Sequence, residues 1–271
     1  MSEHGPVPES GPVDTGADGD EHGSAIERLA EDDDLRDSLA ALSTMATGRL
    51  GLQDVLKKVA ACAVLAVPGA EGAGLTLIEE GRSDTVVTTA PFVQEVDDVQ
   101  YSIGQGPCIT AAAEGKTVMS GSLGGDTRWP RFGARVARMG VHSAVSLPLI
   151  TAEGVVGALN LYAHDKHVFD NRAAEFGEVF AVPAAIAVEN AQVLAASRRL
   201  AAGLQVALET RRVIDHAVGI LMSRSGLSEE QALSRLQRLS QTDHKKLAVV
   251  ARGMVEETLR RARARHASSD D

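Results

Sequence analysis

Residues 143–162 read SAVSLPLITAEGVVGALNLY, and this stretch decides the fold of the first part of the chain. Two apolar runs, 143–150 and 155–162, lie on either side of the turn residues Ala152-Glu153-Gly154. Short apolar runs separated by a glycine-containing turn are typical of antiparallel strands. The stretch therefore predicts a β-hairpin.

Further predicted strands and helices precede this hairpin. Strands are expected at 74–78 and 85–88, around a turn at Gly81, and at 117–119. Apolar residues at helical spacing predict helices that begin near Ser24 and at 51–66, 92–99, 107–114 and 129–139. Strands interrupted by helices indicate an α+β sensor domain.

The chain is predicted to be continuously helical from Asp170 onward. Small and apolar residues recur there in steps of three and four, as in a heptad seam: Val179, Pro183, Ile186, Asn190, Val193, Ser197, Leu200, Leu204, Ala207, Arg211, Ile214, Val218 and Leu221. Pro183 is expected to kink the helix. The dimerisation residues suggested by this seam are Ile186, Asn190, Val193, Leu200 and Leu204. The alternative is a helix whose stripe packs on its own sensor domain.

The last quarter of the chain is basic, whereas the whole protein carries a net charge of −10. Residues 204–266 contain twelve Lys and Arg against seven Asp and Glu, a balance of +5, so the other residues carry −15. Gly226 suits a helix stop, Ser228 and Gln231 form a capping box, and Asp243 is expected to cap a third helix. The pattern predicts an all-α three-helix module that meets a polyanion.

Residues 207–222, ALETRRVIDHAVGILM, resemble the opening helix of ANTAR domains, which are RNA-binding modules of transcription antitermination regulators. The match continues through Gly226-Leu227-Ser228 and His244-Lys245-Lys246-Leu247 and covers roughly 200–258. The resemblance implies a dimer that binds hairpin RNA and blocks formation of a terminator. Val218 departs from the pattern, because many relatives carry a basic residue there, which implies weaker or different RNA recognition.

The candidate RNA-binding residues are Arg211, Arg212, Gly219, Arg224, Lys245 and Lys246. Cationic side chains pair with phosphates, and arginine also stacks on bases. Gly219 would let the RNA approach the backbone. Each of these residues also has an alternative interpretation. A cationic side chain on a surface often contacts only water, and Gly219 would equally serve tight packing between helices.

Residues 50–165 resemble a GAF domain, a sensor fold with a central antiparallel sheet. The resemblance is carried by YSIGQGPC at 101–108, RWPRF at 128–132, HSAVSLPL at 142–149 and the strand at 154–162. The order of sensor, coiled helix and ANTAR module resembles that of actinobacterial regulators. The candidate sensor pocket consists of Tyr101, Cys108, Trp129 and His142, and the ligand and any cofactor are unknown.

Individual side chains in the sensor leave other chemistry open. His142 is either a haem ligand or a core histidine, and His164 with His167 forms an HxxH pair without further ligands, so no metal site is predicted. Cys108 lies near a helix N-terminus, where the dipole would lower a thiol pKa. It is therefore either a redox centre, with Cys62 as its partner, or a small buried hydrophobe.

The predicted organisation is a disordered acidic tail at 1–23, a sensor domain with N-terminal helices at 24–169, a coiled helical linker at 170–203, an ANTAR module at 204–263 and a tail at 264–271. No apolar run long enough for a membrane span and no secretory signal is recognised. With only two cysteines, these features predict a cytoplasmic protein.

The resulting functional hypothesis is a dimeric, non-enzymatic RNA-binding antitermination regulator under the control of a ligand-binding sensor. Two alternatives remain: a thiol redox enzyme or sensor acting through Cys108, and a regulator that binds DNA or another protein through its helical module.

Overall fold

The computed structural model describes residues 17–45, 50–79 and 82–267. The chain divides into two compact units, residues 1–195 and 196–271. The first unit contains all five strands of the described chain, and the second contains helices. The two units are taken separately below.

The first unit is built around one antiparallel sheet with strand order β2-β1-β5-β4-β3. The strands are β1 (Gly72–Glu79), β2 (Arg82–Thr88), β3 (Val118–Ser120), β4 (Ser143–Thr151) and β5 (Gly154–Ala163). The predicted hairpin is confirmed, with Val145 opposite Leu161 and Leu147 opposite Leu159. It supplies two of the three inner strands of the sheet.

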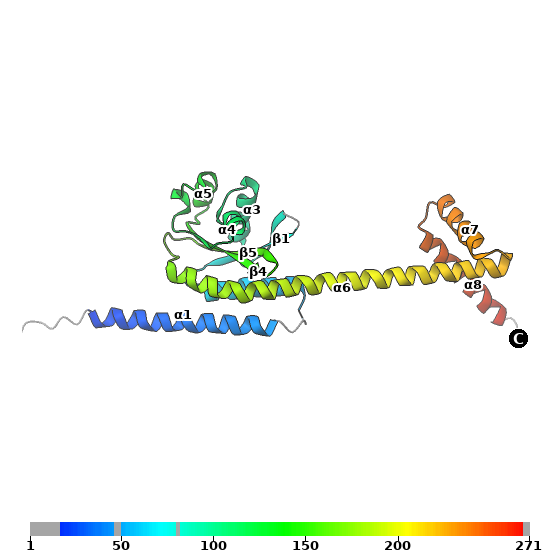
Figure 1. Ribbon diagram of the computed structural model, residues 1–271, viewed down its shortest axis with the longest axis horizontal. Helices are drawn as coiled ribbons and strands as arrows, with labels where there is room; N and C mark the ends of the chain where they lie inside the picture. The colour runs from blue at the N-terminus through cyan, green and yellow to red at the C-terminus, as the bar shows by residue number, and fades with distance from the viewer. Residues whose placement is uncertain (1–16, 46–49, 80–81, 268–271) are drawn as a thin grey trace, which may run out of the picture. The chain divides into compact units, whose positions relative to one another are not determined.

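Helices cover both faces of this sheet (Figure 1). Helices α2 (Leu52–Ala66) and the first part of α6 (Asn171–Ser225) cover one face, and α3 (Pro91–Ile103), α4 (Pro107–Glu114) and α5 (Pro130–Ala137) cover the other. Helix α1 (Ala17–Met45) packs against α2, and a short 3-10 turn lies at Leu123–Gly125. Alternate strand residues face opposite ways, so Leu161 packs in the core with α2 and α6, whereas Tyr162 packs with α3 and α5. The α+β sensor architecture is confirmed.

Helix α1 begins at Ala17, several residues before the start expected near Ser24. The predicted disordered tail therefore overlaps α1 at 17–23, and its residues 1–16 lie outside the described residues. The later part of α1 buries Leu42 and Met45 in the same core as α2. Ser38 donates a hydrogen bond from Oγ to the carbonyl oxygen of Cys62, at 3.2 Å.

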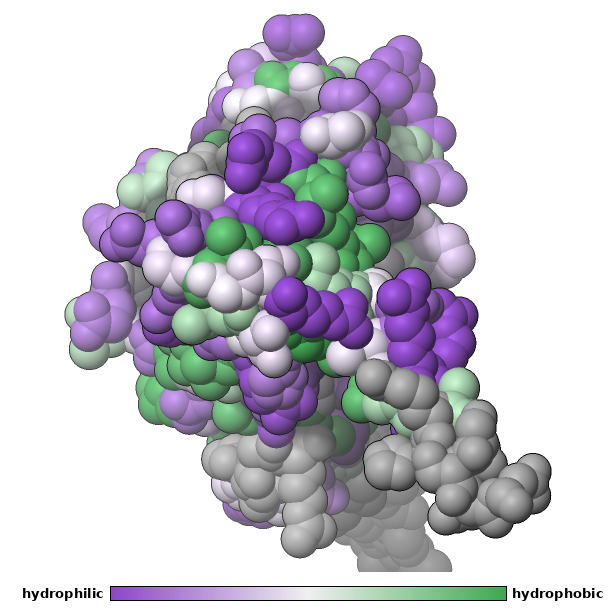
Figure 2. Space-filling model, turned by 90° about the vertical axis from the view of Figure 1, so that its right-hand side faces the viewer, coloured by the Kyte–Doolittle hydropathy of each residue, from purple (hydrophilic) through white to green (hydrophobic). Residues whose placement is uncertain are grey.

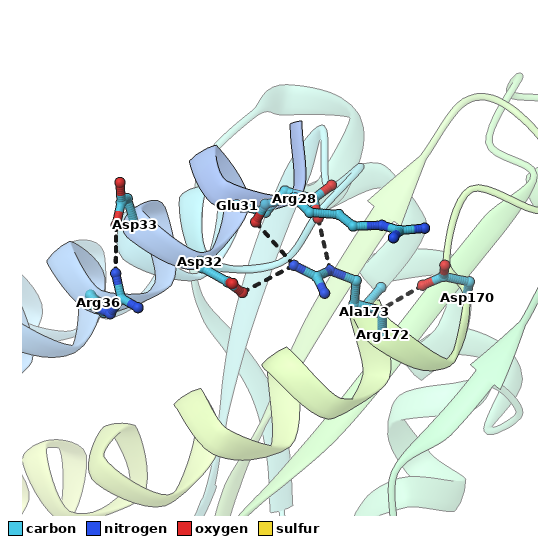
Figure 3. Close-up of polar contacts among 8 residues, drawn as sticks. All are labelled: Arg28, Glu31, Asp32, Asp33, Arg36, Asp170, Arg172 and Ala173. Atoms are coloured by element: carbon cyan, nitrogen blue, oxygen red, sulfur yellow. Dashed lines mark hydrogen bonds and ion pairs between the residues drawn. The ribbon is translucent and has the colours of Figure 1, made fainter. Parts of the chain in front are cut away.

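Arg172, in the first turn of α6, connects that helix to α1 (Figure 3). Its guanidinium lies 2.8 Å from Oε2 of Glu31 and 3.0 Å from Oδ1 of Asp32. It also donates to the carbonyl oxygen of Arg28, at 3.1 Å, and lies 4.6 Å from the ring centre of Phe176. We call this set of contacts the Arg172 clamp.

Helix α6 continues through Pro183 to Ser225, so the proline does not end the helix. By length and composition alone, α6 is apolar enough to cross a membrane, with a window of mean hydropathy 1.6. The sequence has no unbroken apolar run of that length, as expected, but many alanines and valines raise the mean hydropathy of this window. Buried helices of soluble proteins pass the same criterion, and 39% of the window is buried.

The second unit packs the end of α6 against α7 (Glu229–Thr242) and α8 (Leu247–Ala267). Its fully or nearly fully buried residues are Ala217, Val218, Leu221, Ala232, Leu236 and Ala251. Gly226 adopts φ +67° after α6, and Ser228 with Gln231 forms the predicted capping box. Asp243 ends α7 instead of capping α8, so that prediction is wrong. His244, at φ +52°, reverses the chain there, and α8 begins only at Leu247.

Replacing Arg172 with alanine should loosen α1 locally, because the two carboxylates and the Phe176 ring lose their common partner. We expect the free energy for local opening of α1 to fall by about 1 kcal/mol, as measured by amide hydrogen exchange. Arg36→Ala is the matched control, since Arg36 pairs with Asp33 at an exposed site within α1. Equal exchange in the two variants would contradict a role for the clamp in holding α1.

Candidate nucleic-acid interface and sensor core

Four of the six candidate RNA-binding residues lie on the last turns of α6. Arg211, Arg212, Gly219 and Arg224 are all exposed. The Nε atom of Arg211 lies 3.9 Å from Oδ2 of Asp215, one turn further along the helix. Arg224 donates a hydrogen bond from Nη2 to Oγ1 of Thr258 on α8, at 3.1 Å. The cationic groups of Arg211 and Arg224 are thus partly positioned by neighbours.

The other two candidates, Lys245 and Lys246, lie in the turn between α7 and α8. Ser240 fixes this turn, because its Oγ donates to the carbonyl oxygen of Lys245 at 2.6 Å and its carbonyl accepts from the Lys245 amide at 3.1 Å. The Nζ atom of Lys245 lies 3.9 Å from Oδ2 of Asp243. The backbone is held while both lysine side chains remain exposed.

A groove of about 540 Å³ runs between α6 and α8 within the second unit. Its lining residues are Asp215, His216, Gly219, Ile220, Ser223, Arg224, Val255, Thr258 and Leu259. We call it the α6–α8 groove. It brings together two of the predicted residues, Gly219 and Arg224, and Lys245 and Lys246 are not part of its lining.

Hydrophilic residues cover much of the face shown in Figure 2 and surround smaller hydrophobic areas. A second groove, of about 500 Å³, lies along α7 and contains Arg235 and Arg238. Neither arginine is among the candidates predicted from the sequence, and Asp215 and His216 were missed as well. The signal for the missed pair is helical spacing, since residues 215, 216, 219 and 220 lie on adjacent turns of one face.

Val218 packs in the core of the helical trio and is 6% exposed. The side chain at this position points toward Ala232, Leu236 and Ala251 and not toward solvent. The valine therefore contributes to the stability of the module through apolar burial.

In the sensor unit, polar side chains fill the space between the sheet and helices α3 and α4. The Tyr101 hydroxyl lies 3.2 Å from Sγ of Cys108 and 2.6 Å from Oγ1 of Thr76. Beside them, Asp97 accepts hydrogen bonds from the Tyr162 hydroxyl at 2.7 Å and from Nδ2 of Asn160 at 3.2 Å. We call these residues the sensor-core cluster.

Glycines allow the helices to approach the sheet closely at this cluster. A Cβ atom on Gly74 of β1 would overlap the Asp97 carboxylate, and one on Gly106 would overlap the Gln100 amide. The Oε1 atom of Gln100 accepts the amide hydrogen of Cys108 at 3.0 Å, whereas its Nε2 has no partner among the described residues. The chain's own side chains thus occupy the region where α3 and α4 meet the sheet.

Burial determines the ionisation of this cluster. It raises the pKa of the Cys108 thiol to about 11, and the nearby Asp97 carboxylate adds to the rise. The pKa values of Tyr101 and Tyr162 are also raised, chiefly by burial. The pKa of this thiol is thus raised and not lowered as its place near a helix N-terminus led us to expect, and burial is the main cause. The alternative, a small buried hydrophobe, agrees with an exposure of 2%.

The predicted sensor-pocket residues are only partly brought together. Tyr101 and Cys108 are in contact, and Trp129 reaches α4 by donating from Nε1 to Oγ1 of Thr110 at 2.9 Å. His142 lies at the start of β4, where its amide donates to the carbonyl oxygen of Ala163 at 3.0 Å. No hydrogen bond of the described residues links its ring to the other three, and its buried Nδ1 has no partner there.

His164, His167 and Cys62 make local structural contacts. His164 forms an ion pair with Glu71 and packs on the Phe92 ring at 4.6 Å, whereas the His167 amide donates to the carbonyl oxygen of Gly121 at 2.8 Å. Within the described ranges, no group of three or more His, Cys, Asp or Glu residues is arranged to hold a metal ion. Cys62 packs in the core with α1 and α2, on the sheet face opposite α3 and α4.

Two family models match the chain: a GAF domain model at residues 50–189 and an ANTAR domain model at residues 202–255. No curated protein matches the chain significantly.

Several solved structures are similar to the sensor unit. The GAF domain of a phosphoenolpyruvate-protein phosphotransferase from Coxiella burnetii is 16% identical, with 60% of this chain and 97% of that chain covered and a TM-score of 0.48. A free methionine-R-sulfoxide reductase from Neisseria meningitidis is 18% identical, with 58% and 90% covered and a TM-score of 0.45. A putative GAF sensor protein from Burkholderia vietnamiensis is 16% identical, with 61% and 98% covered and a TM-score of 0.45.

The GAF model covers more than half of the chain and includes the whole sheet described above. The ANTAR model begins within α6 and includes α7 and the first part of α8. The chain therefore belongs to the GAF domain family and carries an ANTAR domain in its C-terminal part.

Proposed function

We propose that this protein is a transcription antitermination regulator whose ANTAR module binds hairpin RNA near terminators under the control of the GAF sensor. The observation that carries the proposal is the ANTAR match over a compact helical trio whose cationic side chains are exposed. Cations on a folded surface attract the RNA backbone, and unstacked loop bases supply sequence information. We propose that the protein acts in the cytoplasm, where transcripts are made.

The two faces of α6 support a dimer formed along this helix. One face packs Phe180, Ala184 and Val188 against the sensor sheet. The other leaves large apolar side chains exposed at seven-residue spacing: Ile186 at 51%, Val193 at 61% and Leu200 at 76%. Leu204 and Asn190 are exposed as well. The helix therefore packs on its own sensor and still has a stripe that a second copy would bury.

A groove beside this stripe would add to the same contact in the sensor unit. It has a volume of about 520 Å³ and lies between α6 and the end of β4, with Pro148, Ile150, Ala181 and Val182 among its lining residues. Ile150 and Val182 are 45% and 62% exposed. Burial of these apolar groups would favour association of two chains.

We propose that an unidentified small molecule sets the state of the sensor. Such a ligand changes the output only by binding one conformation better than another. The side chains of the sensor-core cluster already occupy the space between the sheet and α3–α4. A ligand there would therefore have to displace Tyr101 or the Gly104–Gly106 turn. The helix α6, which begins in the sensor and ends in the ANTAR domain, is the proposed route of the signal.

Reversing the charge of both turn lysines, Lys245→Glu with Lys246→Glu, should weaken hairpin RNA binding at least tenfold. The plot of log affinity against log salt concentration should also become shallower, by roughly 0.7–0.9 in slope for each phosphate that no longer pairs with a cation. Fluorescence anisotropy with labelled hairpins at several salt concentrations measures both quantities.

The matched control is Lys57→Glu with Lys58→Glu, an exposed lysine pair on α2 that changes the net charge equally. Unchanged binding by the Lys245/Lys246 variant would remove these residues from the interface. Equal binding of duplex DNA and hairpin RNA by the unaltered protein would favour the DNA-binding alternative.

Replacing Leu200 and Leu204 with glutamate should convert the protein to monomers, because two exposed apolar residues of the proposed seam become charged. Light scattering coupled to size-exclusion chromatography gives the mass. Leu65→Glu is the control, since Leu65 is 64% exposed on α2. The control should remain a dimer, and a dimer that survives the double substitution would place the interface elsewhere.

Cys108 should react slowly with iodoacetamide at pH 8, because a thiol with a pKa of about 11 is only about one part in a thousand ionised there. Peptide mass spectrometry should show Cys62 labelled first in the folded protein and both thiols labelled at similar rates in urea. Faster labelling of Cys108 than of Cys62 in the folded state would support the thiol enzyme or redox sensor instead.

A further inference from the structure

The α6–α8 groove is lined by both apolar and polar side chains. Ile220 on α6 and Val255 and Leu259 on α8 provide the apolar surface, and Leu259 is 51% exposed. The polar groups are the Asp215 carboxylate, the His216 ring, the hydroxyls of Ser223 and Thr258, and the Arg224 guanidinium. Both hydrogen-bond acceptors and donors therefore border an open apolar surface.

Gly219 keeps this groove open. No heavy atom outside its own helical turn lies within 4 Å of the position that a Cβ would take, so tight packing between helices does not explain the glycine. The contrast is Gly133 in the sensor, where a Cβ would overlap the backbone of Leu123. A glycine inside a helix costs about 1 kcal/mol relative to alanine. At position 219 this cost is not offset by packing in the described structure.

The chemistry of the groove suits the flat ring of a nucleobase. A phosphate group would be bound best by cations alone, yet Asp215 places a carboxylate in the lining. If a helix of a second copy packed into the groove, Asp215, His216 and Arg224 would lose their contact with water. Burial of such polar groups without hydrogen-bond partners costs free energy. A base has an apolar face for Ile220 and Val255 and has polar edges that both donate and accept hydrogen bonds.

We propose that the α6–α8 groove takes one unstacked base of an RNA hairpin loop, with its ring over Gly219 and its edge bonded by Asp215 and His216. This inference rests on the proposed function and names the part of the RNA that this surface recognises. Arg224 binds the phosphate next to that base, and its hydrogen bond to Thr258 holds the guanidinium in place before the RNA arrives.

The proposal assigns separate tasks to the two surfaces of the module. Lys245 and Lys246 lie on another turn and contact phosphates, so they supply affinity that depends on salt. The groove contacts a base edge, so it supplies preference among loop sequences. A change that fills the groove should therefore lower affinity and alter the salt slope by no more than the one phosphate contact of Arg224.

The experiment compares Gly219→Leu with Gly253→Leu in the full chain. Both glycines are exposed within helices, and at both the position of a Cβ is free of heavy atoms from outside the helical turn within 4 Å, but only Gly219 lines the groove. A library of RNA hairpins with one common stem and randomised loops selects a tight binder for the unaltered protein. That hairpin is then labelled with 2-aminopurine at each loop position in turn.

For the unaltered protein and Gly253→Leu, fluorescence at one loop position should change on binding. Gly219→Leu should lose this change, bind the selected hairpin at least tenfold more weakly, and change the salt slope by no more than roughly 0.7–0.9, the contribution of one phosphate. As a second variant, Asp215→Asn should change which base is preferred at that loop position when the selection is repeated.

Three results would overturn the inference. If Gly219→Leu binds the selected hairpin as Gly253→Leu does, the groove holds no base. If Gly219→Leu loses affinity and light scattering shows that it has also become monomeric, the groove is a protein interface. If neither the unaltered protein nor Gly253→Leu binds any hairpin of the library, the proposed function itself is wrong. The present inference, which rests on it, is then wrong as well.

Discussion

The close packing of the first part of α6 on the sensor sheet is the constraint on which the rest of this structure depends. Gly177 permits it, because a Cβ there would lie 2.7 Å from a methyl group of Leu147 on the inner strand β4. With Phe180 and Val188 fully buried on the same face, the helix cannot rotate without opening the sensor core. This packing decides which residues of α6 remain exposed and are free to meet a second chain.

The fixed face of α6 also determines how a signal from the sensor can travel. The sensor-core cluster lies on the opposite sheet face, so the strands that both faces share can carry a change at Tyr101 or Asp97 to α6. Tyr162 and Leu161 are neighbours on β5 that point to the two faces, which makes β5 one such link. The Arg172 clamp adds a second attachment, because it joins the first turn of α6 to α1.

Local patterns allowed most elements to be predicted, whereas contacts between distant residues did not follow from them. The hairpin around Gly154, the helix stop at Gly226 and the Ser228 capping box depend on neighbours only a few residues apart. Asp97 meets Asn160 and Tyr162 across more than sixty residues, so no spacing indicated this buried cluster. The pKa of Cys108 was misjudged for the same reason, since the helix terminus is visible in the sequence and the burial is not. The α6–α8 groove likewise needs α7 to bring α8 back beside α6.

Within the ANTAR domain, adjacent residues connect the core to the surface. Val218 is buried against Ala232 and Ala251, and the next residue, Gly219, lies in the α6–α8 groove. On α8, Ala251 lies in the same core, and Val255, one turn later, lines the groove. A shift of α6 against α8 therefore changes the core packing and the width of the groove together. Because close-packed cores tolerate few intermediate arrangements, such a shift would alter the shape of the groove in discrete steps.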